Sequence, residues 1–336
     1  MPTLSSSLSS TPAQAAPDAA KRASIEHLPV NLFASVMGIA GLALAWRQAS
    51  HAFGVSLLFS ETAGLLAVAV ALGLGAGYAV KAVKHWDAVV AEFEHPIAGN
   101  FFGTIAIAIL LLSAVIAPVS QVSAEVVWTV GVAVTFVLCF NIAGRLLQGK
   151  VDIAHAVPAW FIPGVATLDI NVTGGTMPMP WAHEVNLFAM AVGTVLALVF
   201  FAIIMARLIH HEPLPMAMTP SLMIMMAPFE VGFLAYTNFM QRIDTFAGML
   251  FYFGLFLFLV LGPKVFRKGV PFGAGWWALG FPLAALTGAA LKYAAYAQAW
   301  PVTAIAIALL GILSVAIAVL FAKTLRMLFN GKLLAG

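Results

Sequence analysis

Ten apolar stretches of about 20 residues each constrain this chain of 336 residues more than any other feature. They cover residues 28–49, 57–82, 97–117, 123–147, 156–172, 181–208, 218–239, 243–263, 272–294 and 301–322. The hydrocarbon core of a bilayer is about 30 Å thick, and a helix of about 20 apolar residues crosses it. The sequence therefore predicts an all-α, polytopic membrane protein with ten transmembrane helices, which form a single domain over residues 27–330.

The composition excludes the main soluble classes. Only 9% of the residues are charged and 62% are hydrophobic, whereas a soluble domain carries roughly 25% charged residues. A soluble enzyme, a nucleic-acid binder and a disordered protein are all excluded on this ground. One cysteine, Cys139, rules out a disulfide framework and a multi-cysteine metal site. We expect no catalytic residues, no metal and no cofactor.

The N-terminal segment differs from the rest of the chain. Residues 1–26 are rich in Ser, Ala, Pro and Thr and contain no apolar core of the kind a signal peptide has. We expect them to form a disordered cytoplasmic tail.

The positive charges predict an orientation in the membrane. Thirteen of the sixteen Lys and Arg residues lie on the side of the expected bundle that holds the N-terminus, and Arg47, Arg242 and Lys292 lie on the other side. Because cytoplasmic loops carry the excess of Lys and Arg, both termini are expected in the cytoplasm.

A recurring proline indicates an internal repeat. Each odd-numbered span opens near a proline, and the five are Pro29, Pro96, Pro158, Pro220 and Pro271, separated by 67, 62, 62 and 51 residues. Proline in the first turn of a helix costs no hydrogen bond, because that N–H has no partner within the helix. The pattern predicts one helical hairpin used five times, with an odd helix going out and an even helix coming back.

A second set of prolines separates inner from outer helices. Pro163, Pro228 and Pro282 lie inside odd spans, whereas the apolar bodies of the even spans contain none. A proline at membrane depth frees a carbonyl, which is tolerated only against protein or water. We therefore expect the odd helices, kinked at these prolines, to form an inner ring around a central pore, with the longer even helices outside.

Several segments resemble the tellurite-resistance/dicarboxylate transporter family, which includes bacterial TehA and the plant guard-cell slow anion channels. They are the first span from Leu28 to Trp46, His95-Pro96 with Asn100-Phe101-Phe102, Ala227-Pro228, Asp244-Thr245, and Gly275 to Pro282. The resemblance covers residues 27 to about 328. It implies five tandem hairpins with quasi-five-fold symmetry, odd helices lining the pore, and a homotrimer in a bacterial inner membrane.

The resemblance also implies a gate at Phe281, next to Pro282. A phenyl ring across a narrow apolar pore keeps it dry, and a dry constriction blocks ions by denying them hydration. The positive edge of the ring is compatible with a passing anion. The alternative is that Phe281 simply packs inside the bundle.

Other aromatic residues are candidates for lining the pore. Phe33, Phe102 and Phe161 lie one to two turns into the first, third and fifth spans, and Phe229 lies in the seventh. They form either apolar layers of the pore or packing contacts between odd and even helices.

We expect one carboxylate, Glu230, inside an apolar span and facing the pore. An ionised carboxylate at the bilayer centre costs several kcal/mol, so it must meet a partner, water or a proton. Three roles stay open: a structural acid paired with Lys292 or Arg242, a protonation switch, or a proton-coupling site.

These features predict a protein that passes small anions through a central pore gated by Phe281. We expect no cation deep in an odd span, so anion binding would be weak, and no buried Arg offers bidentate capture of a dicarboxylate. The alternative is a secondary carrier or exporter for tellurite, sulfite or C4-dicarboxylates, proton-coupled through Glu230. The expected partners are small anions, the lipid bilayer and two further copies of the chain, and no nucleic acid.

Overall fold

The computed structural model describes residues 24–149 and 151–335, and all regular secondary structure in these residues is helical. The α-helices are α1 (Phe33–Phe53), α2 (Leu58–Lys84), α3 (Trp86–Glu94), α4 (Gly103–Ile116), α5 (Gln121–Leu147), α6 (Phe161–Gly174), α7 (Ala182–His210), α8 (Ala227–Met240), α9 (Thr245–Val265), α10 (Gly280–Ala297) and α11 (Trp300–Phe329). The 3-10 helices are η1 (Ile25–His27), η2 (Val30–Leu32), η3 (Ala98–Phe102), η4 (Ile153–His155), η5 (Pro158–Trp160), η6 (Met216–Met226) and η7 (Ala274–Leu279). The expected all-α membrane class is confirmed.

The helices follow the predicted spans closely. Within the described residues, nine helices are long and apolar enough to cross a membrane. The remaining predicted span, 156–172, is occupied by η5 and the 14-residue α6. Ten crossings therefore stay a prediction. The short helix α3, which lies between the second and third spans, was not expected.

Five helices close a ring. In chain order α1 contacts α4, α4 contacts α6, α6 contacts α8, α8 contacts α10, and α10 returns to contact α1. These helices are the odd members of the predicted hairpins. The ring is thus the inner layer that the positions of the prolines predicted.

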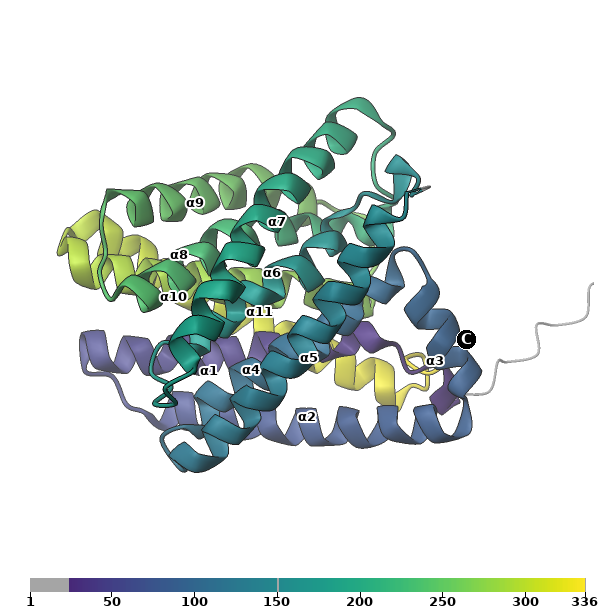
Figure 1. The fold of residues 1–336 in the computed structure, drawn as a ribbon, viewed down its shortest axis with the longest axis horizontal. Helices are drawn as coiled ribbons and strands as arrows, with labels where there is room; N and C mark the ends of the chain where they lie inside the picture. Colours follow the sequence, from purple (N-terminus) through teal and green to yellow (C-terminus); the bar gives the residue numbers. More distant parts are fainter. Residues whose placement is uncertain (1–23, 150, 336) are drawn as a thin grey trace, which may run out of the picture.

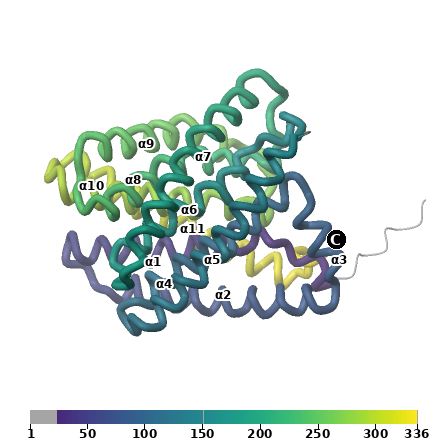
Figure 2. The backbone as a smooth tube through the Cα atoms, viewed as in Figure 1, coloured from purple at the N-terminus to yellow at the C-terminus, as the bar shows by residue number. Residues whose placement is uncertain are grey.

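The other five long helices cover the grooves of this ring. Helix α2 packs on α1 and α4, α5 on α4 and α6, α7 on α6 and α8, α9 on α8 and α10, and α11 on α10 and α1. Figure 1 shows α2 and α9 on opposite sides of the view, and the tube in Figure 2 shows α1 and α6 between them. Each hairpin thus contacts the next in a cyclic order, and an exact five-fold symmetry stays a prediction.

Each inner helix begins with a 3-10 segment. Helices η2, η3, η5, η6 and η7 lead directly into α1, α4, α6, α8 and α10. The repeated prolines mark these segments: Pro158 and Pro220 lie inside them, and Pro29, Pro96 and Pro271 lie one to three residues before them. The sequence repeat therefore encodes a change of helix type at the start of each inner helix.

The prediction that prolines kink the inner helices in their middle is wrong, because the chain changes there from a 3-10 helix to an α-helix. Pro163, Pro228 and Pro282 lie in the first turns of α6, α8 and α10, where a missing N–H leaves no hydrogen bond unmade. Helices α1 and α4 show the same change from 3-10 to α without a proline. Among the outer helices α9 holds Pro263, in its last turn.

The two ends of the described chain meet at one face of the bundle. The backbone N–H of Ser24 donates to the carbonyl of Leu334 at 3.1 Å, and Figure 1 shows the C-terminus next to α3. We name this side the terminal face and the other side the opposite face. The predicted tail lies outside the described residues except for its last three, of which Ile25 and Glu26 begin η1.

Candidate functional site

Three cavities lie inside the ring, and each is lined by residues from all five inner helices or their 3-10 segments. The terminal vestibule, next to Asn31 and Ser221, has a volume of about 380 Å³. The central cavity, next to Met37 and Ile224, has a volume of only about 30 Å³. The opposite vestibule, next to Lys292, has a volume of about 250 Å³. The inside of the ring is therefore wide at both ends and narrow in the middle.

The terminal vestibule is held in shape by a buried ion pair. Lys81 of α2 donates to Glu92 of α3 at 2.7 Å and to the carbonyl of Leu28 at 2.8 Å. The same carboxylate accepts from the N–H of Val30 at 2.7 Å and from the hydroxyl of Tyr78 at 2.9 Å. Glu92 also lines the vestibule. Four hydrogen bonds, three accepted by Glu92 and one donated by Lys81 to the carbonyl of Leu28, compensate the two charges for their burial in a low dielectric and fix α3 and η2 around the mouth.

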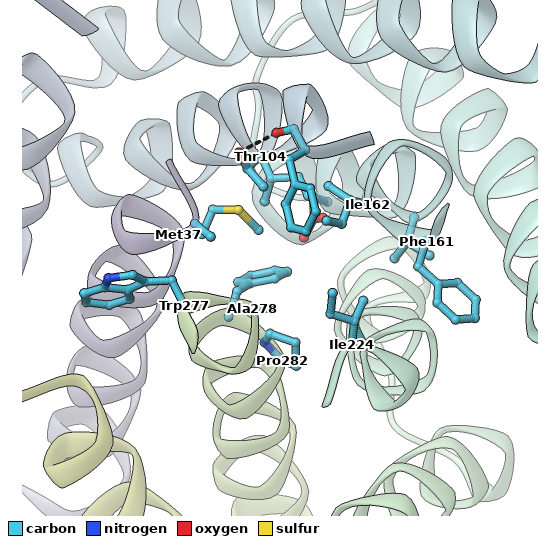
Figure 3. Close-up of a pocket in the computed structure, with 15 residues that line it drawn as sticks. Met37, Thr104, Phe161, Ile162, Ile224, Trp277, Ala278 and Pro282 are labelled. Carbon is cyan, nitrogen blue, oxygen red and sulfur yellow. Dashed lines mark hydrogen bonds between the residues drawn. The ribbon is translucent and has the colours of Figure 1, made fainter. Parts of the chain in front are cut away.

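The central cavity is narrow and apolar. Figure 3 shows Met37, Ile162, Ile224 and Trp277 arranged around it, from four different elements of the ring. A cavity needs a volume of roughly 10–15 Å³ to hold one water molecule, so this cavity has room for only a few. An ion cannot carry a hydration shell through such a space.

Two phenylalanines separate the central cavity from the vestibules. Among the described residues, Phe281 alone lines both the central cavity and the opposite vestibule, and Phe101 alone lines both the central cavity and the terminal vestibule. Phe281 is 7% exposed. Gly41 of α1 lies beside its ring, because a methyl group on Gly41 would be in van der Waals contact with the ring at 3.9 Å.

The opposite vestibule contains a half-buried cation. Lys292 of α10 lines it and donates to the side-chain oxygen of Asn238, whose amide nitrogen donates to the carbonyl of Val172 at 2.8 Å. Lys292 makes no ion pair with any described carboxylate. Lys292 lies near the C-terminal end of α10, at the opposite end of the ring, and the expectation that no cation lies deep in an odd span stays a prediction.

Of the predicted lining aromatics, Phe161 alone reaches a cavity inside the ring. Phe33 and Phe102 pack edge-on against Tyr78 of α2. Phe229 packs against Phe253 of α9, with ring centroids 4.5 Å apart. These three side chains make the packing contacts between inner and outer helices that the sequence left as the alternative.

The comparisons with known proteins decide the family. A model of the family described as voltage-dependent anion channel, SLAC1, matches residues 27–325. The chain belongs to this family. The family is of the anion-channel type and not one of enzymes, and the resemblance seen in the sequence is confirmed.

Similar proteins come from plants, archaea and bacteria. The chain is 26% identical to the guard cell S-type anion channel SLAC1 of Arabidopsis thaliana, over 89% of this chain and 55% of the relative. It is 27% identical to an uncharacterized transporter of Methanocaldococcus jannaschii, over 59% of this chain and 64% of the relative. It is 26% identical to the tellurite resistance protein TehA homolog of Haemophilus influenzae, over 79% of this chain and 81% of the relative. The chain thus spans 55% to 64% of the length of the first two relatives.

Glu230 does not face the ring in this member of the anion channel family. Its side chain is completely buried and lies against Gly254 of α9, where a methyl group would overlap the carboxyl group. The two candidate cations are engaged elsewhere: Lys292 with Asn238, and Arg242 with Asp244 at 3.3 Å. The prediction that Glu230 lines the pore is corrected, because α8 turns this side chain outward toward α9.

A second buried carboxylate, Asp169, was missed. It lies inside the predicted span 156–172, is completely buried, and lines the central cavity together with Phe281. The signal was present in the sequence, because a carboxylate in an apolar span is as unusual at this position as at Glu230. The spacing of Ile162, Val165 and Asp169 also follows one face of a helix.

The starts of all five inner α-helices surround the central cavity of this anion channel family member. The first turns of α1, α4, α6, α8 and α10 contribute the lining residues Ala34, Thr104, Phe161, Ala227 and Phe281. Each of these helices continues from a 3-10 segment, whose carbonyls accept from the N–H at its start. These turns are therefore not free helix ends, and they leave the cavity wall apolar.

Proposed function

We propose that this chain conducts small anions across a membrane along the axis of the inner ring, and that Phe281 is the gate. The observation that carries the proposal is the position of Phe281 between the central cavity and the opposite vestibule. Membership of the voltage-dependent anion channel family supports the class of ion.

The width of the ring supports a closed state. A cavity of about 30 Å³ walled by Met37, Ile224 and Phe281 holds too little water to hydrate an ion. Rotation of the Phe281 side chain out of its position between them would join the central cavity to the opposite vestibule. The gate would then act through one side chain while the ring stays intact.

The charges of the pathway support anions. Lys292, which makes no ion pair with any described carboxylate, supplies a positive charge at the opposite end. A single cation attracts anions loosely and leaves the choice among nitrate, chloride and other small anions broad.

A secondary carrier for tellurite, sulfite or C4-dicarboxylates is the second candidate. It is favoured by the closure of the central cavity on both sides, at Phe101 and at Phe281, because a carrier closes its site alternately to each side. Single-channel recordings separate the two: unitary currents indicate a channel, whereas saturable transport without them indicates a carrier.

The gate is tested by Phe281→Ala in purified protein reconstituted into liposomes. We expect nitrate flux to rise at least about tenfold, since removal of the ring lets water reach the constriction. Phe229→Ala, which removes an equal side chain from the contact with α9, is the matched control and should leave the flux unchanged. Equal fluxes in Phe281→Ala and in the unsubstituted protein, at equal reconstitution, contradict the gate.

The proposal includes the membrane, the orientation and the oligomeric state of the channel. We place it in a bacterial inner membrane with both termini in the cytoplasm, on the distribution of Lys and Arg. The family resemblance supports a homotrimer, in which the outer helices would meet. Mass measurement in lipid nanodiscs distinguishes one copy from three.

A further inference from the structure

Asp169 has no assigned function, yet it is the one titratable side chain among the described residues that line the central cavity. It lies on α6 one turn beyond Val165, and its exposed fraction is 0%. Neither of its carboxylate oxygens has a hydrogen-bond partner in the part of the chain that the structure describes. The carboxyl group is thus buried, unpartnered and next to the narrowest part of the pathway.

No hydrogen bond or ion pair among the described residues explains why the carboxyl group of Asp169 is buried. Buried polar groups are normally hydrogen-bonded, and an unpaired carboxylate in an apolar setting is unfavourable. A neutral carboxyl group removes the charge but brings a new requirement, because its O–H then lacks an acceptor. The missing acceptor points to a ligand that enters the cavity.

The other polar side chains on the cavity wall cannot serve an anion. The hydroxyl of Thr104 donates to the carbonyl of Phe101 at 2.6 Å, the contact drawn in Figure 3. The indole N–H of Trp277 donates to Thr324 of α11 at 2.9 Å, away from the cavity. A dehydrated anion in this space therefore has one possible side-chain donor, which is the protonated carboxyl of Asp169.

We propose that Asp169, in its protonated form, is the anion-binding residue of the central cavity, with an O–H that donates a hydrogen bond to a small inorganic anion as it passes Phe281. Proton binding forms the O–H bond on a carboxylate oxygen, and the proton stays there while the anion moves on. The ionised carboxylate would instead repel the anion across a few ångströms of low dielectric. The inference rests on the proposed conduction of anions along the ring.

The surroundings leave Asp169 free to respond to pH by itself. The segments α4, η3 and η5, which pack on α6, and η6 and η7 across the cavity carry no titratable side chain. The titratable residues of the other helices around it are Glu125, Cys139 and Arg145 on α5, His183, Glu184, Arg207 and His210 on α7, Glu230 and Tyr236 on α8, Arg47 and His51 on α1, and Lys292, Tyr293 and Tyr296 on α10. Among the described residues, none of these lines the central cavity.

The first test measures nitrate flux against pH in liposomes, in the open Phe281→Ala background. We expect the flux to fall about tenfold for each pH unit above the titration midpoint, as the protonated fraction falls. Addition of Asp169→Asn, whose amide donates a hydrogen bond at every pH, should hold the flux within about twofold over the same range. A flux independent of pH in Phe281→Ala, or an unchanged pH dependence after Asp169→Asn, overturns the proposal.

Glu230 supplies the matched control. It is equally buried and equally unpartnered among the described residues, but it faces Gly254 and not the cavity. Glu230→Gln in the same background should therefore keep the pH dependence. If Glu230→Gln abolishes that dependence and Asp169→Asn does not, the proton site has been assigned to the wrong carboxylate.

The second test needs no flux. Infrared difference spectra of the protein in lipid show the carbonyl stretch of a protonated carboxylic acid, and Asp169→Asn identifies the band of Asp169. We expect nitrate to shift this band, since the O–H gains an acceptor, and to leave the band removed by Glu230→Gln unchanged. If the nitrate shift is seen but Phe281→Ala conducts nothing, the binding site stands and the gate fails. If the Asp169 band is missing, or if nitrate does not shift it, Asp169 is not the anion-binding residue, whatever the flux measurements give.

Discussion

The inner and outer helices of this chain differ in burial, length and continuity. In the span Ala274–Ala297, formed by η7 and α10, 83% of the most apolar segment is buried, whereas in α2 the value is 17%. The inner α-helices contain 14 to 21 residues, and the outer helices contain 21 to 30. Every inner helix starts with a 3-10 segment, and no described outer helix does.

The difference shows which layer meets lipid. An α-helix of 14 residues spans about 21 Å, less than the roughly 30 Å of a bilayer core. Helices α4 and α8 reach the length of a crossing only together with η3 and η6, over Ala98–Ile116 and Met216–Met240, so each of these spans contains a change of helix type. Backbone of this kind is tolerated only where protein surrounds it. The outer layer supplies this surrounding protein, and the three cavities of the pathway lie inside the ring that it covers.

The largest expected effect concerns the joint between two inner helices. A methyl group on Gly41 of α1 would lie 2.6 Å from the Cβ atom of Ala284 on α10, whereas one on Gly73 of α2 would meet no atom within 4 Å. We expect Gly41→Ala to destabilise the protein by about 1–3 kcal/mol, as overpacking does. Thermal unfolding in detergent measures the loss.

Gly73→Ala is the matched substitution on the outer layer and should leave the unfolding temperature unchanged or slightly raised, since alanine favours a helix. If Gly41→Ala and Gly73→Ala lower the unfolding temperature equally, the inner ring is not packed more tightly than the outer layer.

A smaller effect is expected from charges inside and outside the ring. Lys292→Gln should lower nitrate conductance about fivefold in the Phe281→Ala background, because a unit charge at about 4 Å in a wet cavity attracts an anion by about 1 kcal/mol. Lys323→Gln on α11, whose ammonium group lies 4.9 Å from the ring centre of Phe272, is the control. Conductance that falls equally in both variants would mean that net charge, and not the position of Lys292, attracts the anion.

The smallest effect concerns the turn that joins an inner helix to an outer one. The hydroxyl of Tyr236 donates to Asp244 at 2.6 Å and lowers the pKa of that carboxyl below its ordinary value of 3.8, helped by the N–H of Ala247, which donates at 3.1 Å. A lowered pKa means that the ionised carboxylate stabilises the fold above about pH 4 and that this contribution is lost as the pH falls through the lowered pKa.

Asp244→Asn should therefore lower the unfolding temperature slightly at neutral pH and make a smaller difference at pH 2, where more of the carboxylate is protonated. Unfolding curves at the two pH values measure this. A larger loss at pH 2 than at pH 7 would contradict the assigned role of the carboxylate.

Much of the architecture could be predicted from the sequence, because a bilayer makes hydrophobic length decisive. The limits of the spans agree with the helices to within a few residues at most ends. The recurring prolines from Pro29 to Pro271 predicted the five inner starts, since proline marks places where the α-helical pattern begins. The prolines Pro163, Pro228 and Pro282 correctly separated inner from outer helices, although they begin α-helices and do not kink them. The gate at Phe281 and the exact symmetry stay predictions.

The sequence by itself determined that this chain is a helical membrane protein with two layers of helices, because hydrophobic length and proline placement are local properties of each segment. Only the tertiary structure decided which side of each inner helix faces the axis. It turned Glu230 and Phe229 outward and brought Asp169 and Lys292 inside. A helix that is apolar on every side has no polar face to show which side points to the axis of the ring. The rotation of each helix about its own axis therefore depends on how glycines and side chains pack between neighbouring helices.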